Sequence, residues 1–447
     1  MRSRLLQRNL RSDPPLALTG EGIFIRDSNG RTVIDGSGGA AVACLGHGHP
    51  RVLAAMKAQM DRISYAHTAL YSCESAEALA DLVLDGEPGG LTHLYLCSSG
   101  SEGAEAALKL ARQYHVERGE PQRSRFIARR QSYHGNTLGA LAAGGNMMRR
   151  ALYQPLLSES FSHVSPCYAY RDRRDDESDA DYVARLAAEL EAKFQALGPQ
   201  NVAGFMAEPV LGATLGCVTA LPGYFKAVRE ICDRHGALLI LDEVMCGMGR
   251  TGTMHAWEQE GIAPDIQIVA KGLGGGYQPV GGILISGKVI AAIRDGSGAF
   301  MHGHTYQAHP VASAAALAVQ QVIREEKLLD NVQAMGALLE QRLTERLGNH
   351  RHVGDIRGRG LFWAVELVAD RASKAVFDPA LQLHERVKGE AYERGLACYS
   401  MGGTIDGRQG NHVILAPPYI VTREQVDAIV ERFGDAVEAA VATLARG

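Results

Sequence analysis

Residues 264–282 read PDIQIVAKGLGGGYQPVGG, and this stretch indicates the fold more strongly than any other part of the chain. Its first part, IQIVA (266–270), is apolar on both faces, as a strand is when helices cover both sides of its sheet. Lys271 follows this strand directly, and a glycine-rich turn follows the lysine. Ligands of open α/β sheets bind at the carboxyl ends of the strands, so the stretch predicts a sheet with a site at its edge.

Similar apolar runs predict further strands, namely THLYLC (92–97), RFIA (125–128), VAGFMAEPV (202–210), ALLILDEV (237–244) and GGILIS (281–286). Amphipathic stretches alternate with these runs and predict helices over 102–117, 182–197 and 223–235. This alternation predicts an α/β fold whose sheet is mainly parallel. We expect the charged run RDRRDDESDAD (171–181) to be a solvated surface loop.

The pattern changes beyond His309. Helices are predicted over 311–326, 328–347 and 423–444, and strands over 359–368 and 411–420, which together indicate a second, α+β domain. Near the start of the chain, the Asn29-Gly30 pair predicts a hairpin between two short strands. Periodicity alone does not decide whether this hairpin joins the second domain.

Composition excludes several classes of function. The 46 basic and 50 acidic side chains give a formal net charge of −4, which argues against bulk nucleic-acid binding and against adhesion to an anionic membrane. The first 20 residues lack the apolar core of a signal peptide, and the longest uncharged stretch (299–323) is too polar to span a membrane. The eight cysteines form no CxxC pair, so we expect reduced thiols, no zinc site and a cytoplasmic location.

The reactive chemistry centres on Lys271, one of only nine lysines among the 46 basic residues. An ammonium group at a strand end serves either as a phosphate-binding charge or as a reactive amine. Phosphate-binding loops place their glycines before the lysine, whereas here the glycines follow it. The order therefore favours a reactive amine.

Asp242 ends the apolar strand 237–244, 29 residues before Lys271, so we expect it on a neighbouring strand. A buried acid is costly unless a cation pairs with it. One interpretation is a helix cap or a salt bridge to Arg250. The other is an anion held against a protonated heterocycle.

Three more segments fit a bound ligand. In LCSSGSEGAEAALKLAR (96–112) a strand, a serine-glycine turn and a helix form a possible anion site, although Ser99 and Glu102 also fit a capping box. In QSYHGNT (131–137), Tyr133 would stack on a planar ring or is a half-buried loop aromatic. In MHGHTYQAHP (301–310), Thr305 would bond a phosphate or cap a helix. Pyridoxal phosphate needs all of these features together with a lysine and a carboxylate.

Five strings resemble the class III aminotransferases, namely DEVMCGMGRTG, PDIQIVAKGLGGGYQPVGG, SSGSEGAEAALKLAR, YHGNT and HGHTYQAHPVASAAALA. This family comprises fold-type I pyridoxal-phosphate enzymes, including ω-amino-acid, ornithine and 4-aminobutyrate aminotransferases. The resemblance runs from about Gly22 to Thr422 and so covers nearly the whole chain.

The resemblance implies that Lys271 forms the Schiff base with the cofactor and that Asp242 pairs with the pyridine nitrogen. The other cofactor contacts that it implies are Ser99, Gly100 and Ser101 at the phosphate, Tyr133 on one side of the ring and Val244 on the other. His134 is a further expected cofactor contact. It implies that Thr305 reaches the phosphate of a neighbouring subunit, and hence a homodimer with active sites at the subunit interface.

The resemblance also implies a large cofactor-binding domain over 51–325 and a small domain built from both termini, residues 1–50 and 326–447. Glu208, in AEPVLGA, matches a glutamate near the substrate. Arg408 is the candidate for the arginine that binds the keto-acid carboxylate, with a solvated loop arginine as the alternative. Ala40 and Ala41 stand where relatives carry bulky residues, which indicates a roomy pocket that Tyr65 and Tyr71 would line.

The expected function is transfer of an amino group from an amine or ω-amino acid to a 2-keto acid, pyruvate or 2-oxoglutarate. Two alternatives remain at this point. The same scaffold and cofactor serve lyases, decarboxylases and aminomutases. A catalytically silent binding protein on this fold is the alternative from another class.

Overall fold

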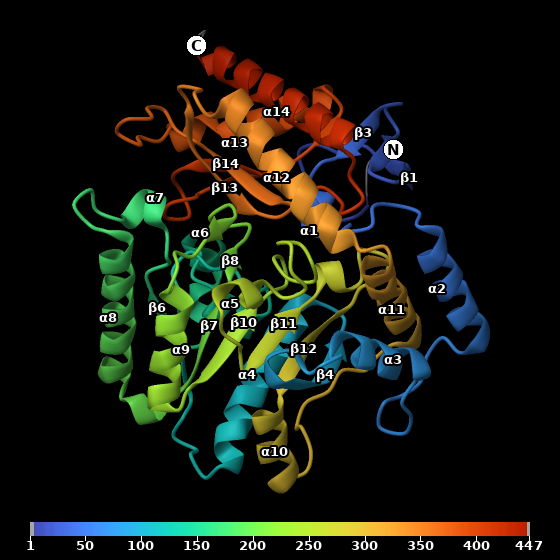
Figure 1. Cartoon of the computed structure of the whole chain (residues 1–447), viewed down its shortest axis with the longest axis vertical. Coiled ribbons are helices and arrows are strands. Elements are labelled where there is room, and N and C mark those ends of the chain that lie inside the picture. Colours follow the sequence, from blue (N-terminus) through green and yellow to red (C-terminus); the bar gives the residue numbers. More distant parts are fainter. Residues whose placement is uncertain (1–3, 445–447) are drawn as a thin grey trace.

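A seven-stranded sheet forms the centre of the lower part of the molecule in Figure 1, a computed structural model that describes residues 4–444. The strand order is β4-β12-β11-β10-β7-β5-β6. Its strands are β4 (Leu91–Cys97), β5 (Arg125–Arg129), β6 (Phe161–Val164), β7 (Val202–Ala207), β10 (Leu238–Asp242), β11 (Ile266–Val269) and β12 (Gly281–Ser286). The strand β12 runs antiparallel to both of its neighbours, and the other six strands all run in the opposite direction to it. The prediction of an α/β fold with a mainly parallel sheet is therefore confirmed.

Helices cover both faces of this sheet, which explains why its strands are apolar throughout. Along β10, Ile240 packs with one layer, while Leu239 and Leu241 pack with the other. The first layer contains α4 (Gly100–Glu117), α5 (Leu138–Ala143) and α10 (Gly287–Asp295). The second contains α3 (Glu74–Val83), α8 (Asp179–Leu197), α9 (Tyr224–His235) and α11 (Pro310–Glu325).

The upper part of the molecule contains segments from both ends of the chain (Figure 1). Its antiparallel sheet has the order β13-β14-β17-β16, with strands β13 (Val353–Arg359), β14 (Phe362–Leu367), β16 (Tyr399–Gly402) and β17 (Asn411–Leu415). Its long helices are α12 (Leu328–Leu347), α13 (Leu383–Glu393) and α14 (Arg423–Leu444).

The N-terminal strands join this part through β3 (Thr32–Asp35), which pairs in parallel with β15 (Leu396–Ala397). With β1 (Ala17–Glu21) and β2 (Phe24–Asp27) they form a four-stranded sheet. The β2–β3 hairpin turns at the predicted Asn29-Gly30 pair. A small α+β domain built from both termini is therefore confirmed, whereas the exact divisions at residues 50 and 325 stay predictions.

Shorter elements connect these parts, namely α1 (Gly38–Ala41), α2 (Pro50–Arg62), α6 (Met147–Arg150), α7 (Ala169–Asp172), β8 (Val210–Leu211) and β9 (Val218–Thr219). Within residues 4–444, no helix has the length and apolar character needed to cross a bilayer.

One expectation about the surface was wrong. The charged run 171–181 is not wholly a solvated loop, because Arg171 in α7 reaches the small domain and bonds Glu366 of β14, with Nε 2.7 Å from Oε1. Glu366 is completely buried and also bonds Arg357. A run of charges in a sequence therefore does not reveal which of its members is buried against another part of the chain.

Candidate active site

A pocket of about 150 Å³ lies where the strands of the large sheet end. Twelve residues line it, namely Ser101, Tyr133, His134, Gly135, Glu208, Val210, Gly212, Ala213, Asp242, Val244, Met245 and Lys271. They follow β4, β5, β7, β10 and β11, whose carboxyl ends meet at one edge because these strands are parallel. Seven of the residues selected from the sequence are therefore brought together.

Lys271 follows β11 with a backbone φ of 42°, in the left-handed region. Such a conformation is costly for a residue with a side chain and is common at functional sites. Burial lowers the pKa of its amino group to about 8, although the charge of Asp242 acts in the opposite direction. A substantial fraction of this amine is therefore neutral, and nucleophilic, at a mildly alkaline pH.

Asp242 is buried at the end of β10, and both of its carboxylate oxygens accept hydrogen bonds. Oδ2 lies 2.8 Å from Nδ1 of His134, and Oδ1 accepts from the backbone N–H of Val244 at 3.0 Å. Arg250 does not form the salt bridge considered above, because its Nη1 donates to the carbonyls of Leu361 and Pro417. The carboxylate is thus held in one orientation in the pocket wall.

The turn before α4 combines both interpretations that the sequence left open. Ser99 caps the helix, since its Oγ accepts from the N–H of Glu102 at 3.2 Å. Ser101, one residue into the helix, faces the pocket instead. A Cβ on Gly135 would lie 2.7 Å from Oγ of Ser101, so the loop after β5 approaches the helix N-terminus in a way that only glycine allows.

Tyr133 lines the pocket, and the guanidinium of Arg149 lies 4.6 Å from the centre of its ring. Val244 reaches the same pocket from the loop after β10. The atom Nε of Arg149 is buried and has no hydrogen-bond partner within residues 4–444. The guanidinium of Arg149 therefore lies against the aromatic wall of the pocket with one N–H group unpaired.

Glu208 follows β7 and is buried, which raises the pKa of its carboxyl group. Its Oε1 accepts from the N–H of Tyr133 at 3.3 Å, and Oε2 lies 3.6 Å from Nη2 of Arg129. Arg129 is completely buried and was not predicted from the sequence. It is the last residue of β5, so the strand-end rule that selected Lys271 and Asp242 could have found it.

Seven other predicted residues do not line this pocket within the described chain. Thr305, Tyr71 and Arg408 are exposed, and the hydroxyl of Tyr65 donates to the carbonyl of Thr305 at 2.9 Å. Ala41 is buried and packs in one cluster with Val210, which does line the pocket. Ser99 and Gly100 lie at its edge, where a Cβ on Gly100 would meet Val244 at 2.9 Å.

The pocket thus offers a nucleophilic amine, an oriented carboxylate, the N-terminal end of an 18-residue helix and an aromatic side chain. Helix N-terminal amides bind phosphate. An amine at this place can form a covalent bond to a carbonyl carbon, and a buried carboxylate can keep a nearby heterocycle protonated.

Comparison with known proteins shows which family the chain belongs to. A family model described as Aminotransferase class-III matches residues 11–437. An uncharacterised aminotransferase of Schizosaccharomyces pombe is 47% identical over 431 residues, which cover 96% of this chain and 94% of the relative. A diaminobutyrate–2-oxoglutarate transaminase of Halomonas elongata is 35% identical, covering 96% of this chain and 91% of the relative.

Among solved structures, the omega transaminase of Pseudomonas jessenii in complex with PMP has a TM-score of 0.93 at 33% identity, covering 100% of this chain and 98% of that one. The match with the family model and the identity to these relatives both extend over nearly the whole chain. The chain therefore belongs to the class III aminotransferases.

Proposed function

We propose that this aminotransferase moves an amino group from an amine or ω-amino acid to a 2-keto acid at the Lys271 pocket, with pyridoxal phosphate as its cofactor. The observation that carries the proposal is the amine of Lys271, with a pKa of about 8, in one pocket with the oriented carboxylate of Asp242. The relative from Halomonas elongata is named for 2-oxoglutarate, and the Pseudomonas jessenii structure contains PMP.

The pocket residues fit the cofactor. Nε2 of His134 is buried without a partner in residues 4–444, and Gly135 leaves space against Ser101 that a Cβ would fill. Gly100, Ser101 and the first turn of α4 would hold the phosphate, with Ser99 at the edge as the cap. Tyr133, supported by His134, would contact one side of the ring, and Val244 the other.

When bound, pyridoxal phosphate supplies an aldehyde that accepts the amino group and a pyridinium ring that withdraws electrons. Asp242 would hold the proton on the ring nitrogen, because its oxygens are already oriented by His134 and Val244. The neutral Nζ of Lys271 would take the proton from the substrate Cα and deliver it to C4′ of the cofactor. Burial lowers the pKa of Lys271 to about 8, so that its amine can both accept and release this proton.

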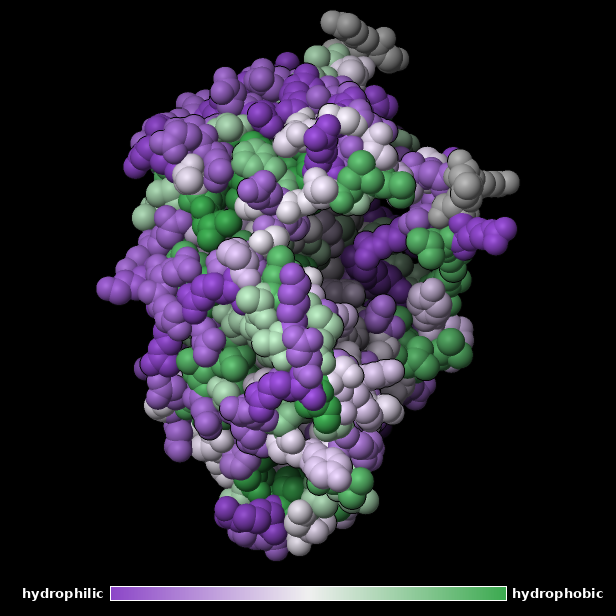
Figure 2. All heavy atoms as spheres, turned by 90° about the vertical axis from the view of Figure 1, so that its right-hand side faces the viewer, coloured by the Kyte–Doolittle hydropathy of each residue, from purple (hydrophilic) through white to green (hydrophobic). Residues whose placement is uncertain are grey.

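We also propose a homodimer in which Thr305 reaches the phosphate in the partner's site. Exposed apolar side chains gather on two segments next to Thr305, namely Met60, Ile63, Tyr65, Leu70 and Tyr71 on one, and Met301 and Tyr306 on the other. The ring of Tyr65 packs edge-on against that of Tyr306, with centres 6.0 Å apart. Figure 2 shows the side of the molecule on which α2 lies, where apolar side chains interrupt the polar surface around a hollow.

Substrate recognition is proposed for a second set of residues. Glu208 would lie near the substrate, with Ala41 behind the pocket wall leaving room for a large donor. Tyr65 and Tyr71 would line the entrance in the dimer. The carboxylate of the keto acid would bind Arg408, which is exposed on the loop between β16 and β17.

The absence of disulfides among the described cysteines supports a cytoplasmic location.

A panel of amine donors tests the proposal, with pyruvate and 2-oxoglutarate as acceptors and keto-acid consumption as the readout. Transfer to at least one acceptor is expected, together with its loss in Lys271→Ala. Release of ammonia or carbon dioxide without transfer would move the assignment to a lyase or decarboxylase. Exchange of amino groups by Lys271→Ala would contradict the central role of the lysine.

A further inference from the structure

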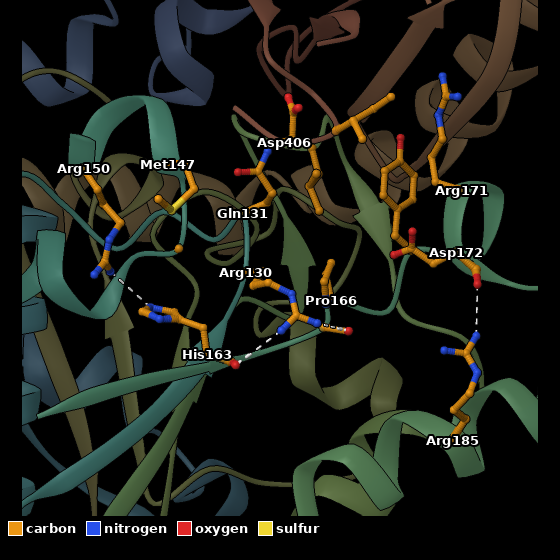
Figure 3. A pocket seen from close by; sticks show the side chains of 15 residues that line it. Arg130, Gln131, Met147, Arg150, His163, Pro166, Arg171, Asp172, Arg185 and Asp406 are labelled. Atoms are coloured by element: carbon orange, nitrogen blue, oxygen red, sulfur yellow. Dashed lines mark hydrogen bonds between the residues drawn. The ribbon is translucent and has the colours of Figure 1, made fainter. Parts of the chain in front are cut away.

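A second cavity, of about 820 Å³, lies beside the Lys271 pocket and is much larger than it. Its wall comes from the segments after β5 and β6, from α6, α7 and α8, and from the β16–β17 loop (Figure 3). Gln131 belongs to this wall, whereas Tyr133, two residues later, lines the Lys271 pocket. The segment that contains these two residues therefore forms part of the wall of both cavities.

Four arginines line this cavity, and three of them have a carboxylate partner nearby. The three pairs, each with an N–O distance of 2.7–3.0 Å, are Arg130 with Glu189, Arg171 with Glu366, and Arg185 with Glu177. Their charges are locally compensated, so they give the cavity little selectivity for an anion.

Arg150, at the end of α6, is different. It is only 8% exposed, and its Nη1 donates to the carbonyls of Ala142, at 2.6 Å, and Gly144. No acidic side chain of residues 4–444 pairs with it, and Nη1 is its only nitrogen with a hydrogen bond in that part of the chain. Burial lowers the pKa of this guanidinium, with no acidic group opposing the effect.

The neighbour of Arg150 on the cavity wall is His163, whose Nε2 lies 3.3 Å from Nη1 of the arginine, as the dashed line in Figure 3 marks. Burial lowers the pKa of His163 to about 4, so the imidazole is neutral at neutral pH. It therefore supplies polarity without competing charge.

The acids of the cavity do not neutralise Arg150. Asp406 uses Oδ1 to accept the backbone N–H groups of Arg408 and Gln409 in its own loop. Asp172 lies on the opposite side of the cavity from Arg150, next to Arg185 (Figure 3). Asp172 carries a raised pKa through burial, which Arg185, Arg130 and Arg171 oppose.

A buried cation without a counter-charge is costly, and a bound anion relieves that cost. Because Nη1 of Arg150 is occupied by carbonyls, the edge that remains is Nε with Nη2. Two parallel N–H groups of this kind match the two oxygens of one carboxylate. A phosphate dianion would need more donors than this end of the cavity supplies.

We propose that this cavity is a binding site for a small organic carboxylate, which Arg150 binds through its Nε–Nη2 edge. The site is separate from the Lys271 pocket and does not depend on which amine the enzyme uses. Helix α6 lies between the two sites. Its residue Arg149 contacts the ring of Tyr133, and its residue Arg150 faces the cavity.

Calorimetric titration of the cofactor-loaded enzyme with malonate, which is not an amino acceptor, tests the proposal. Wild-type enzyme is expected to bind malonate, and Arg150→Gln to bind it about 10- to 100-fold more weakly, the effect of losing hydrogen bonds between charged groups. Arg150→Lys, which keeps the charge but lacks the paired N–H edge, is expected to recover only part of the affinity. Arg185→Gln, in the same wall, is the matched control and should bind as the wild type does.

Three results would overturn the proposal. They are equal malonate binding by Arg150→Gln and wild type, complete displacement of malonate by a saturating keto acid, and tighter binding of inorganic phosphate than of malonate. Thermal melts establish that each variant is folded. If Arg150→Gln does not fold, Ser165→Glu, which adds a negative charge to the same wall, replaces it and should abolish malonate binding.

Discussion

Nδ1 of His134 lies 2.8 Å from Oδ2 of Asp242, although 108 residues separate them in the chain. The contact joins the loop after β5 to the end of β10, across the intervening strand β7. It fixes the orientation of the carboxylate, because Oδ2 contacts His134 while Oδ1 accepts from the N–H of Val244. His134 is therefore a positioning residue for the carboxylate.

Replacing His134 by Phe should lower kcat about 10- to 100-fold, since a hydrogen bond to a charged group is typically worth about 1.5–3 kcal/mol. His134→Asn, whose amide N–H can take the place of Nδ1, should recover most of the loss. Steady-state kinetics and cofactor affinity of both variants check this. Equal kinetics for His134→Phe and wild type would exclude a positioning role.

The amine of Lys271 should titrate near pH 8 in the cofactor-free enzyme, because burial lowers its pKa from the usual 10.5. Acylation of the neutral amine, followed site by site by mass spectrometry, should therefore reach half its maximal rate at about pH 8. Asp242 raises this pKa, so Asp242→Asn should move the midpoint further down. A midpoint that rises in Asp242→Asn would contradict the assigned electrostatics.

The sequence predicted the parts of the site that depend on strand ends. Lys271, Asp242 and Glu208 each follow an apolar run, and parallel strands bring such ends together without further information. The contact of His134 with Asp242 could not be predicted, because it depends on the strand order β10-β7-β5. The same limit applies to Arg150, whose lack of an acidic partner is a property of three-dimensional packing.

Two features of the fold also escaped prediction for physical reasons. The strand β13 reads VGDIRGR. Its glycines and charged residues do not give the apolar pattern of a strand, and the strand is stabilised by its pairing with β14. The strand β12 was predicted, but not its antiparallel direction. Its run GGILIS is apolar on both faces, and such a run is compatible with either direction in a covered sheet.

Gly135→Ala should weaken cofactor binding at least about 10-fold. Its φ is 136°, and the new Cβ would lie 2.7 Å from Oγ of Ser101, at the proposed phosphate site. Gly119→Ala is the matched control, because Gly119 also has a positive φ, of 75°, but no atom within 4 Å of the Cβ position. Each substitution carries a backbone cost of about 1–3 kcal/mol, because a side chain disfavours a positive φ. Cofactor titration by absorbance separates this shared cost from the steric effect, and equal affinities of the two variants would show that no steric effect exists.

Glu366 connects the two parts of the molecule and should be far more important for stability than an exposed acid. It is completely buried in β14, accepts from Arg357 at 2.6 Å and from Arg171 of α7 at 2.7 Å, and bonds the hydroxyl of Tyr168. Breaking a buried pair leaves an uncompensated charge, which typically costs about 3–5 kcal/mol. Glu366→Gln should therefore lower the free energy of unfolding by about this amount, measured in urea.

Glu438→Gln is the control, because Glu438 forms an exposed pair with Arg346 at 2.5 Å, and such pairs contribute at most about 1 kcal/mol.

The contribution of Glu366 should also depend on pH. Burial raises the pKa of Glu366, but the charges of Arg357 and Arg171 have the larger effect and hold that pKa below the usual 4.5. The stabilisation is then fully present above about pH 4.5 and is lost as the pH falls through the lowered pKa. The difference between wild type and Glu366→Gln should accordingly shrink in acid. A difference that stays constant down to pH 3 would mean that the network contributes no charge-dependent stability.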